Sequence, residues 1–360
     1  GQHGYQRALL AASPDADSGH WLYGLELARN NGPWQNPSEL RKLNGVLRYS
    51  QGTLDNGYAF TGMAYSSKWN STDQIPIRAV QDGSLNRFGS IDPTDGGDTS
   101  RYSISFEQKS QQENGVFAFN TYAIKYRLNL FSNFTYFLDN PINGDQFEQA
   151  DSRVVYGLNS SRSWFGKLGA MESVNKIGVS VRHDHIDNLA LYNTVARQRT
   201  GLTRADAVKQ TSLGAYAENS IQWNDKLRSI VGLRADKYRF NVNSNIAENS
   251  GKADDKLVSP KFSLIAGPWA KTEFFANIGN GFHSNDARGA TITLDPKTLQ
   301  PVDKVNPLVK SRGSELGLRT EIIPNLQTSL ALWQLKSDSE LLFVGDAGTC
   351  TTAGCTGASL

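Results

Sequence analysis

Hydrophobic and polar residues alternate along much of this chain. Between Val116 and Leu130 the even positions are apolar apart from Asn120, and polar residues enter the odd positions at Lys125 and Arg127. Because successive side chains of a strand point to opposite faces, a period of two predicts a strand with one apolar face and one polar face. The same alternation recurs at 177–182, 212–218 and 231–236. The pattern indicates an all-β fold.

The predicted strands are joined by connections that alternate between short and long. The short ones fall at 51–56, 110–114, 166–173, 224–226, 267–271 and 324–325, and the long ones at 30–42, 69–100, 139–151, 187–209, 243–255 and 283–311. Short turns at one rim and long loops at the other are typical of an up-and-down barrel in a bacterial outer membrane. The predicted strands run for roughly 8 to 15 residues, whereas ordinary strands have about 5–6. We therefore predict a transmembrane antiparallel β-barrel, of which the chain supplies a part with about fourteen strands.

Three tryptophans lie at short-turn ends of predicted strands, namely Trp164, Trp223 and Trp269. An indole ring favours the headgroup level of a membrane because the ring is apolar and its N–H can stay hydrated. We expect these residues to form a girdle at the membrane interface. Corner positions in a soluble β fold are the alternative interpretation.

Composition agrees with many strands and turns, since aromatic residues make up 10% of the chain and there are 33 glycines. The formal net charge is only +2, so nucleic acid is not an expected partner. No apolar run approaches the about 20 residues that a transmembrane helix needs, and no signal peptide begins at Gly1. Cys350 and Cys355 are spaced so that a small disulfide can form in an oxidising compartment, and two free thiols fit equally well.

The loop that follows the predicted strand 272–278 carries candidate ligand-binding residues. They are His283, Asn285, Asp286 and Arg288. Polar groups on a loop that a strand holds in place can meet a ligand, here an anionic or metal-chelating group. The alternative is that Asn285 and Asp286 are turn formers that shape the loop.

Other side chains of the long connections are candidates for binding as well. Trp34, Trp69 and Tyr192 would stack on an aromatic ligand or a sugar, or else pack loop against loop. His183 and His185 share one face of a strand, as two metal ligands would, but no third ligand follows nearby. Histidines at the membrane interface are the preferred interpretation, and no metal site is predicted. Positive charge that would attract anionic chelates or lipopolysaccharide phosphates comes from Arg78, Arg87, Arg101, Arg153, Arg197, Arg199 and Arg204.

Several segments resemble the TonB-dependent outer-membrane receptor family, in a branch similar to the ferric-siderophore receptors. The clearest is GFHSNDARG at 281–289. Other segments that resemble the family occur in consistent order along the chain, at 23–52, 63–76, 92–105, 129–151, 232–240 and 315–335.

The resemblance implies a barrel of about 22 strands with a plugged lumen, and residues 1–360 would form one segment of that barrel. It implies a receptor of the cell outer membrane that takes up a scarce ligand, with a ferric siderophore as the favoured one, without a cofactor. The plug domain, which would engage the TonB–ExbB–ExbD complex, would precede Gly1, and the last strands would follow Leu360. Outer-membrane lipid and lipopolysaccharide would surround the barrel.

Other function classes stay open at the level of sequence. A diffusion porin has a similar wall but needs no plug. A barrel enzyme such as a phospholipase is a weaker alternative, since none of the five histidines accompanies a motif such as G-x-S-x-G, and no catalytic residue is predicted. A secreted β-sandwich or propeller would show the same alternation of apolar and polar residues, but such a protein would need no detergent to stay in solution.

Overall fold

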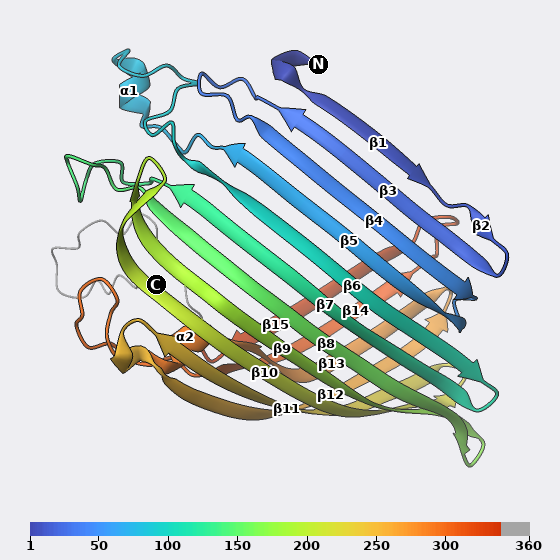
Figure 1. The fold of residues 1–360 in the computed structure, drawn as a ribbon. Coiled ribbons are helices and arrows are strands. Elements are labelled where there is room, and N and C mark those ends of the chain that lie inside the picture. The colour runs from blue at the N-terminus through green and yellow to red at the C-terminus, as the bar shows by residue number, and fades with distance from the viewer. Residues whose placement is uncertain (340–360) are drawn as a thin grey trace.

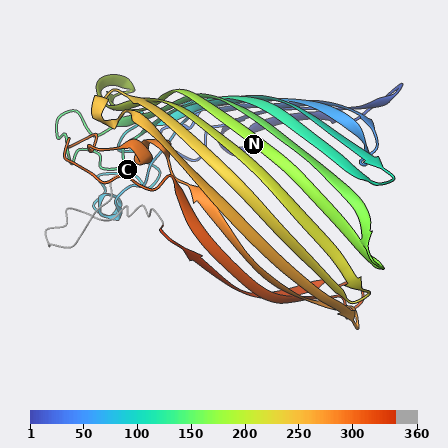
Figure 2. The same ribbon diagram turned by 90° about the horizontal axis from the view of Figure 1, so that it is seen from below.

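The chain forms one large antiparallel sheet that curves into an open trough (Figures 1 and 2). The computed structural model describes residues 1–339. Each strand pairs with the next along the chain from one edge, β1, to the other, β15, and only the short β2 lies off this path, paired with β3. Apart from β2, the sheet therefore has the predicted up-and-down order, and it confirms the prediction of an all-β antiparallel fold.

The helices and strands alternate with turns and loops along the chain. Their bounds are η1 Gln2–Gly4, β1 Gln6–Ala12, β2 Asp15–Ala16, β3 Gly19–Asn30, β4 Leu40–Gly52, β5 Asn56–Asn70, α1 Ile77–Gln81, β6 Gly96–Gln112, β7 Gly115–Ser132, β8 Phe147–Leu168, β9 Met171–Val195, β10 Gln198–Asn224, β11 Leu227–Ser244, η2 Ala247–Asn249, β12 Gly251–Trp269, β13 Thr272–Ser284, α2 Ala287–Thr291, β14 Leu308–Thr320 and β15 Thr328–Ser337.

The two rims of the sheet differ as the sequence predicted, apart from one long connection that is absent and one that is shorter than expected. Short turns gather at one end of the strands, and long connections gather with α1 and α2 at the other (Figure 1). The long connection predicted at 187–209 is wrong, because β9 and β10 continue through it to a two-residue turn at Ala196 and Arg197. Both turn residues have positive φ, 48° and 65°, as in a type I′ hairpin turn. The connection predicted at 243–255 shortens to 245–250.

The two faces of the sheet carry different side chains. The outer face exposes aliphatic residues, among them Ile177, Leu213 and Leu233, each between 51% and 53% exposed. The opposite, concave face carries Ser180 and Arg234, which hydrogen-bond across the sheet at 3.0 Å. An outward apolar band around a polar interior is the arrangement of a transmembrane barrel.

Strand β7 departs from its predicted polarity. Its even positions, predicted as the apolar face, lie on the concave side, where Tyr122 packs over Gly157. An odd residue, Phe119, joins the aromatic side chains of the outer face, with its ring 6.1 Å from that of Phe106, which in turn lies 4.6 Å from the exposed Phe60. Both faces of β7 hold apolar side chains, so the alternation did not identify the outer one.

Among residues 1–339 few apolar side chains are buried, and most of them lie toward the long-loop rim. One cluster joins Ala287 of α2 to Ile186, Val208, Phe240 and Val242 of the neighbouring strands. In the part of the chain that the structure describes, no helix has the length and apolar character to cross a membrane. Backbone pairing within the sheet, rather than a central core, thus organises the fold.

Candidate functional site

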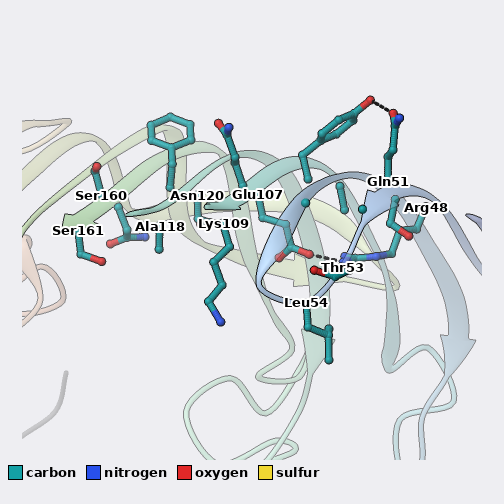
Figure 3. A pocket seen from close by; sticks show the side chains of 18 of the residues that line it. Arg48, Gln51, Thr53, Leu54, Glu107, Lys109, Ala118, Asn120, Ser160 and Ser161 are labelled. Atoms are coloured by element: carbon teal, nitrogen blue, oxygen red, sulfur yellow. Dashed lines mark hydrogen bonds and ion pairs between the residues drawn. The ribbon is translucent and has the colours of Figure 1, made fainter. Parts of the chain in front are cut away.

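A cavity of about 730 Å³ lies against the concave face near the short-turn rim. The side chains of Arg48, Glu107 and Lys109 point beneath the arch of the sheet (Figure 3). Arg48 pairs with Glu107, and Lys109 Nζ lies 2.7 Å from Asp55 Oδ1. The cavity is thus lined by charges that are already paired within the wall.

The same pairing is repeated farther along the concave wall. Successive strands carry an arginine and an aspartate two residues apart, a spacing that puts both side chains on one face of a strand. The closest N–O distance is 2.8 Å for Arg182 with Asp184 and 2.7 Å for Arg234 with Asp236. Equivalent pairs form in β8 and β10, between Arg153 and Asp151 and between Arg204 and Asp206. The Arg-x-Asp spacing was visible in the sequence, but only the sheet brings the pairs side by side.

The predicted loop candidates hold one another in place. Asp286 caps the short helix α2 by accepting a hydrogen bond from Arg288 N, and its carboxylate lies 2.7 Å from Arg288 Nη2. Asn285 donates from Nδ2 to Asn306 O at 2.8 Å across the base of the loop. His283 is exposed and makes no side-chain hydrogen bond within residues 1–339. Three of the four candidates therefore have structural partners.

The pair Asp286–Arg288 is also tied to the barrel wall. Burial acts to raise the pKa of Asp286, but the hydrogen bonds and charge of Arg288 outweigh it and hold that pKa below its ordinary value. Arg288 Nη1 lies 3.9 Å from Asp206, whose side chain is fully buried. The carboxylate of Asp206 accepts from Arg204 Nε at 2.5 Å, while Arg204 Nη2 and Asp206 Oδ1 find no hydrogen-bond partner among residues 1–339.

Gln146, a residue that no sequence signal indicated, joins three segments of the long-loop rim. Its Nε2 donates to Thr94 Oγ1 at 2.7 Å and to Asp95 Oδ1 at 3.1 Å in the β5–β6 loop. Its Oε1 accepts from Thr194 Oγ1 at 3.0 Å and from Arg197 N at 2.8 Å at the tip of the β9–β10 hairpin. We call Gln146, Thr94, Asp95, Thr194 and Arg197 the rim latch.

Arg197 and Asp95 complete the rim latch from opposite sides. Arg197 donates from Nη2 to Asn70 Oδ1 at 2.9 Å and to Asp95 O at 2.7 Å. Burial, a hydrogen bond with Asp73 and the charge of Asp92 together raise the pKa of Asp95 to about 8. The Asp95 carboxyl is therefore largely protonated at neutral pH, although it lies beside an arginine.

The candidate aromatic residues of the long connections are partly covered by neighbours. Arg199 lies over the ring of Tyr192 at 3.8 Å and pairs with Glu148 at 2.6 Å. Trp34 lies 6.1 Å from Phe88, between ring centroids, and thus joins two loops. Trp69 is half-buried at the end of β5, beside Gly97 of β6.

The two neighbouring histidines bind partners other than a metal. His183 Nδ1 lies 2.8 Å from Thr211 Oγ1, and His185 lies 3.0 Å from Asp187. Among residues 1–339, no three His, Cys, Asp or Glu side chains are arranged to hold a metal ion.

The three tryptophans predicted to form a girdle lie toward the short-turn ends of β8, β10 and β12, and the girdle itself stays a prediction. Trp164, Trp223 and Trp269 are 39%, 42% and 51% exposed. Trp223 donates from Nε1 to Ser229 Oγ at 2.8 Å. The predicted disulfide pair, Cys350 and Cys355, lies outside the described residues.

Comparisons with known proteins give a consistent result for the fold. No curated protein matches the chain in sequence. The unliganded ferric citrate transporter FecA is 13% identical with a TM-score of 0.72, and the match covers 93% of this chain and 50% of that one. The ferric yersiniabactin uptake receptor FyuA from Yersinia pestis is 14% identical with a TM-score of 0.66, covering 93% and 53%. The copper transporter OprC is 14% identical with a TM-score of 0.63, covering 92% and 51%.

The chain thus spans about half the length of the solved structures that it resembles. These neighbours are transporters and receptors rather than enzymes. The family model for the TonB-dependent receptor-like β-barrel matches residues 19–359, which is most of the sequence. With its up-and-down sheet, outward apolar band and polar concave wall, the chain belongs to the TonB-dependent receptor family and matches that family's β-barrel.

Proposed function

We propose that residues 1–360 are a barrel segment of a cell outer-membrane receptor that takes up a ferric siderophore through a plugged lumen. The plug, elsewhere in the whole protein, would couple the barrel to the TonB–ExbB–ExbD complex. The observation that carries the proposal is the separation of the two faces, because an apolar outer band with a charged interior suits a wall between lipid and a polar passage.

We assign ligand capture to the long-loop rim. Of the candidate residues, His283 is exposed and has no hydrogen-bonding partner in the described region, so it is the side chain most available to a ligand. Asn285, Asp286 and Arg288 would act by positioning the loop that presents it. Trp69 and Tyr192 would line the neighbouring loops, and Trp164, Trp223 and Trp269 would fix the opposite rim at the membrane interface.

Uptake of radiolabelled iron tests this function. The whole receptor is expressed in a Gram-negative strain that lacks its own siderophore receptors, and ferric catecholates, hydroxamates and citrate are offered in turn. We expect one class to be taken up, with the uptake abolished by deletion of TonB. Uptake of none of these chelates would refute the siderophore assignment. Passage without TonB, with a steady conductance in a planar bilayer, would support a diffusion porin instead.

A further inference from the structure

Three cations form an unbroken row across the outer face of the sheet. Arg29 of β3 is the register partner of Arg41 of β4, and Arg41 is in turn the partner of Lys68 of β5. All three are exposed. Directly opposed side chains of antiparallel strands have Cβ atoms about 4.5–5.5 Å apart, and like charges at that spacing destabilise a sheet. We call Arg29, Arg41 and Lys68 the basic row.

The basic row differs from the cations on the other face of the same strands. On the concave side, Arg7 and Lys42 share the carboxylate of Glu26 at 2.7 Å and 3.0 Å. Within the described chain, by contrast, no residue of the basic row forms an ion pair. The nearest carboxylate by register, Asp98 opposite Lys68, accepts from Asn129 Nδ2 at 3.3 Å instead. Of the three cations, Asp98 thus lies across from Lys68 alone, and Arg29 and Arg41 have no carboxylate as a register partner within residues 1–339.

The basic row lies at the end of an apolar stretch of the outer face. Below it, toward the short-turn rim, the outer side of β3 shows Leu27, Leu25, Tyr23 and Trp21, all exposed. Trp21 to Arg29 is a span of nine residues, close to the about 9–11 that a tilted transmembrane strand requires. The row therefore lies where the apolar band would meet the headgroups of the leaflet on the long-loop side.

A groove accompanies the row and has the same mixed character. It has a volume of about 640 Å³, and its lining includes Leu27 and Leu43 together with the three cations. Leu27 and Leu43 are 47% and 40% exposed. An occupant with a phosphate at one end and hydrocarbon at the other would match both parts, since guanidinium groups bind phosphate oxygens in pairs and leucines contact acyl chains.

We propose that the basic row and its groove bind the phosphorylated headgroup of an outer-leaflet lipid of the lipid A class. This inference rests on the proposed membrane-spanning function, and it assigns to the outer wall a site separate from the path of the cargo. The lipid phosphate supplies the counter-charge that Arg29 and Arg41 lack within residues 1–339, and it fixes the depth of the β3–β5 wall. Its attraction to the cations is weakened by salt, because the site lies at the surface.

The test is equilibrium binding of fluorescent bisphosphorylated lipid A to the whole purified receptor in detergent. The triple variant Arg29→Gln, Arg41→Gln, Lys68→Gln should bind on the order of 100-fold more weakly, at about fivefold for each cation near a lipid phosphate. Dephosphorylated lipid A should bind the wild type as weakly as the triple variant binds the phosphorylated lipid.

A matched control removes three exposed cations at the short-turn rim, Lys167→Gln, Arg228→Gln and Lys271→Gln, and should retain wild-type affinity. Heat-modifiable migration on a gel reports whether each variant is folded. If the triple variant does not fold, Arg41→Gln alone, in the middle of the row, should lose about fivefold.

Equal affinity of the triple variant and the wild type would overturn the site, as would an equal loss in the control. Displacement by inorganic phosphate as effective as that by unlabelled lipid A would assign the groove to a free anion and refute the lipid. Binding is measured without cargo, so a receptor that binds lipid A yet takes up no siderophore would refute the transport proposal alone.

Discussion

Replacement of Gln146 by alanine tests whether the rim latch holds the β9–β10 hairpin to its neighbours. The side chain is 3% exposed, and its amide accepts from Thr194 Oγ1 and Arg197 N while it donates to the β5–β6 loop. Alanine removes these contacts and leaves the donors of Thr194 and Arg197 without their acceptor. The strands β9 and β10 below the tip keep their own ladder.

The size of the effect follows from the cost of unpaired polar groups. A buried donor that loses its partner costs about 1–3 kcal/mol. Two such donors should lower the free energy of local opening at the hairpin tip by at least about 2 kcal/mol, which makes amide exchange about 30-fold faster where exchange follows local opening.

Hydrogen–deuterium exchange read by mass spectrometry measures this directly. Peptides that cover 190–200 should lose protection in Gln146→Ala, and peptides that cover the short turn at 225–226 should not change. Gln198→Ala is the matched control, because Gln198 lies in the same hairpin, is exposed and makes no side-chain hydrogen bond in the described region. Unchanged protection at 190–200, or an equal loss at both turns, would refute the latch.

Three further predictions concern other parts of the barrel. The pKa of Asp95 is raised to about 8, so the rim latch is more stable when this carboxyl is neutral. The stabilisation is fully present below the ordinary pKa near 3.8 and is lost as the pH rises toward 8. Exchange protection of the β5–β6 loop, corrected for intrinsic rates, should therefore fall between pH 5 and 8 in the wild type and become flat in Asp95→Asn; a slope that persists in the variant would contradict this origin. Asp286→Ala removes the cap of α2 and should destabilise that helix by about 0.5–2 kcal/mol, seen as faster proteolysis within 285–307, whereas Asp286→Asn keeps a capping oxygen and should change it less. Fluorescence of Trp164, Trp223 and Trp269 in single-tryptophan variants should be quenched most by nitroxides at the headgroup level, and maximal quenching by a probe at the bilayer centre would exclude the girdle.

The strands themselves were largely predictable, because a period of two follows from the geometry of each strand alone. The alternations at 177–182 and 231–236 identified both the strands and their outer faces, since aliphatic side chains there stay exposed on one side only. The turn residues between the predicted strands located the short-turn rim equally well. The family was indicated by the resemblance of several sequence segments, of which 281–289 is the clearest.

The site was less predictable, because its contacts join residues that are far apart in the chain. Gln146 and Arg197 are separated by 51 positions, and neither has a spacing that signals a latch. The sequence offered Asp286 as a ligand contact or, preferably, a turn former, and Arg288 as a ligand contact. Only the approach of Arg288 to Asp206 shows how the pair is fixed to the wall.

The sequence by itself determined the all-β architecture and, outside β7, the apolar outer face, since these depend on neighbours within a strand. The up-and-down order of the strands followed from the alternation of short and long connections. Tertiary structure decided the length of β9 and β10, because three register irregularities after Arg199 shift the alternation and the turn at Ala196 has no glycine to announce it. It also decided which face of β7 points outward, since both carry apolar side chains. Pairing with β6 and β8 in a fixed register sets the orientation of such a strand.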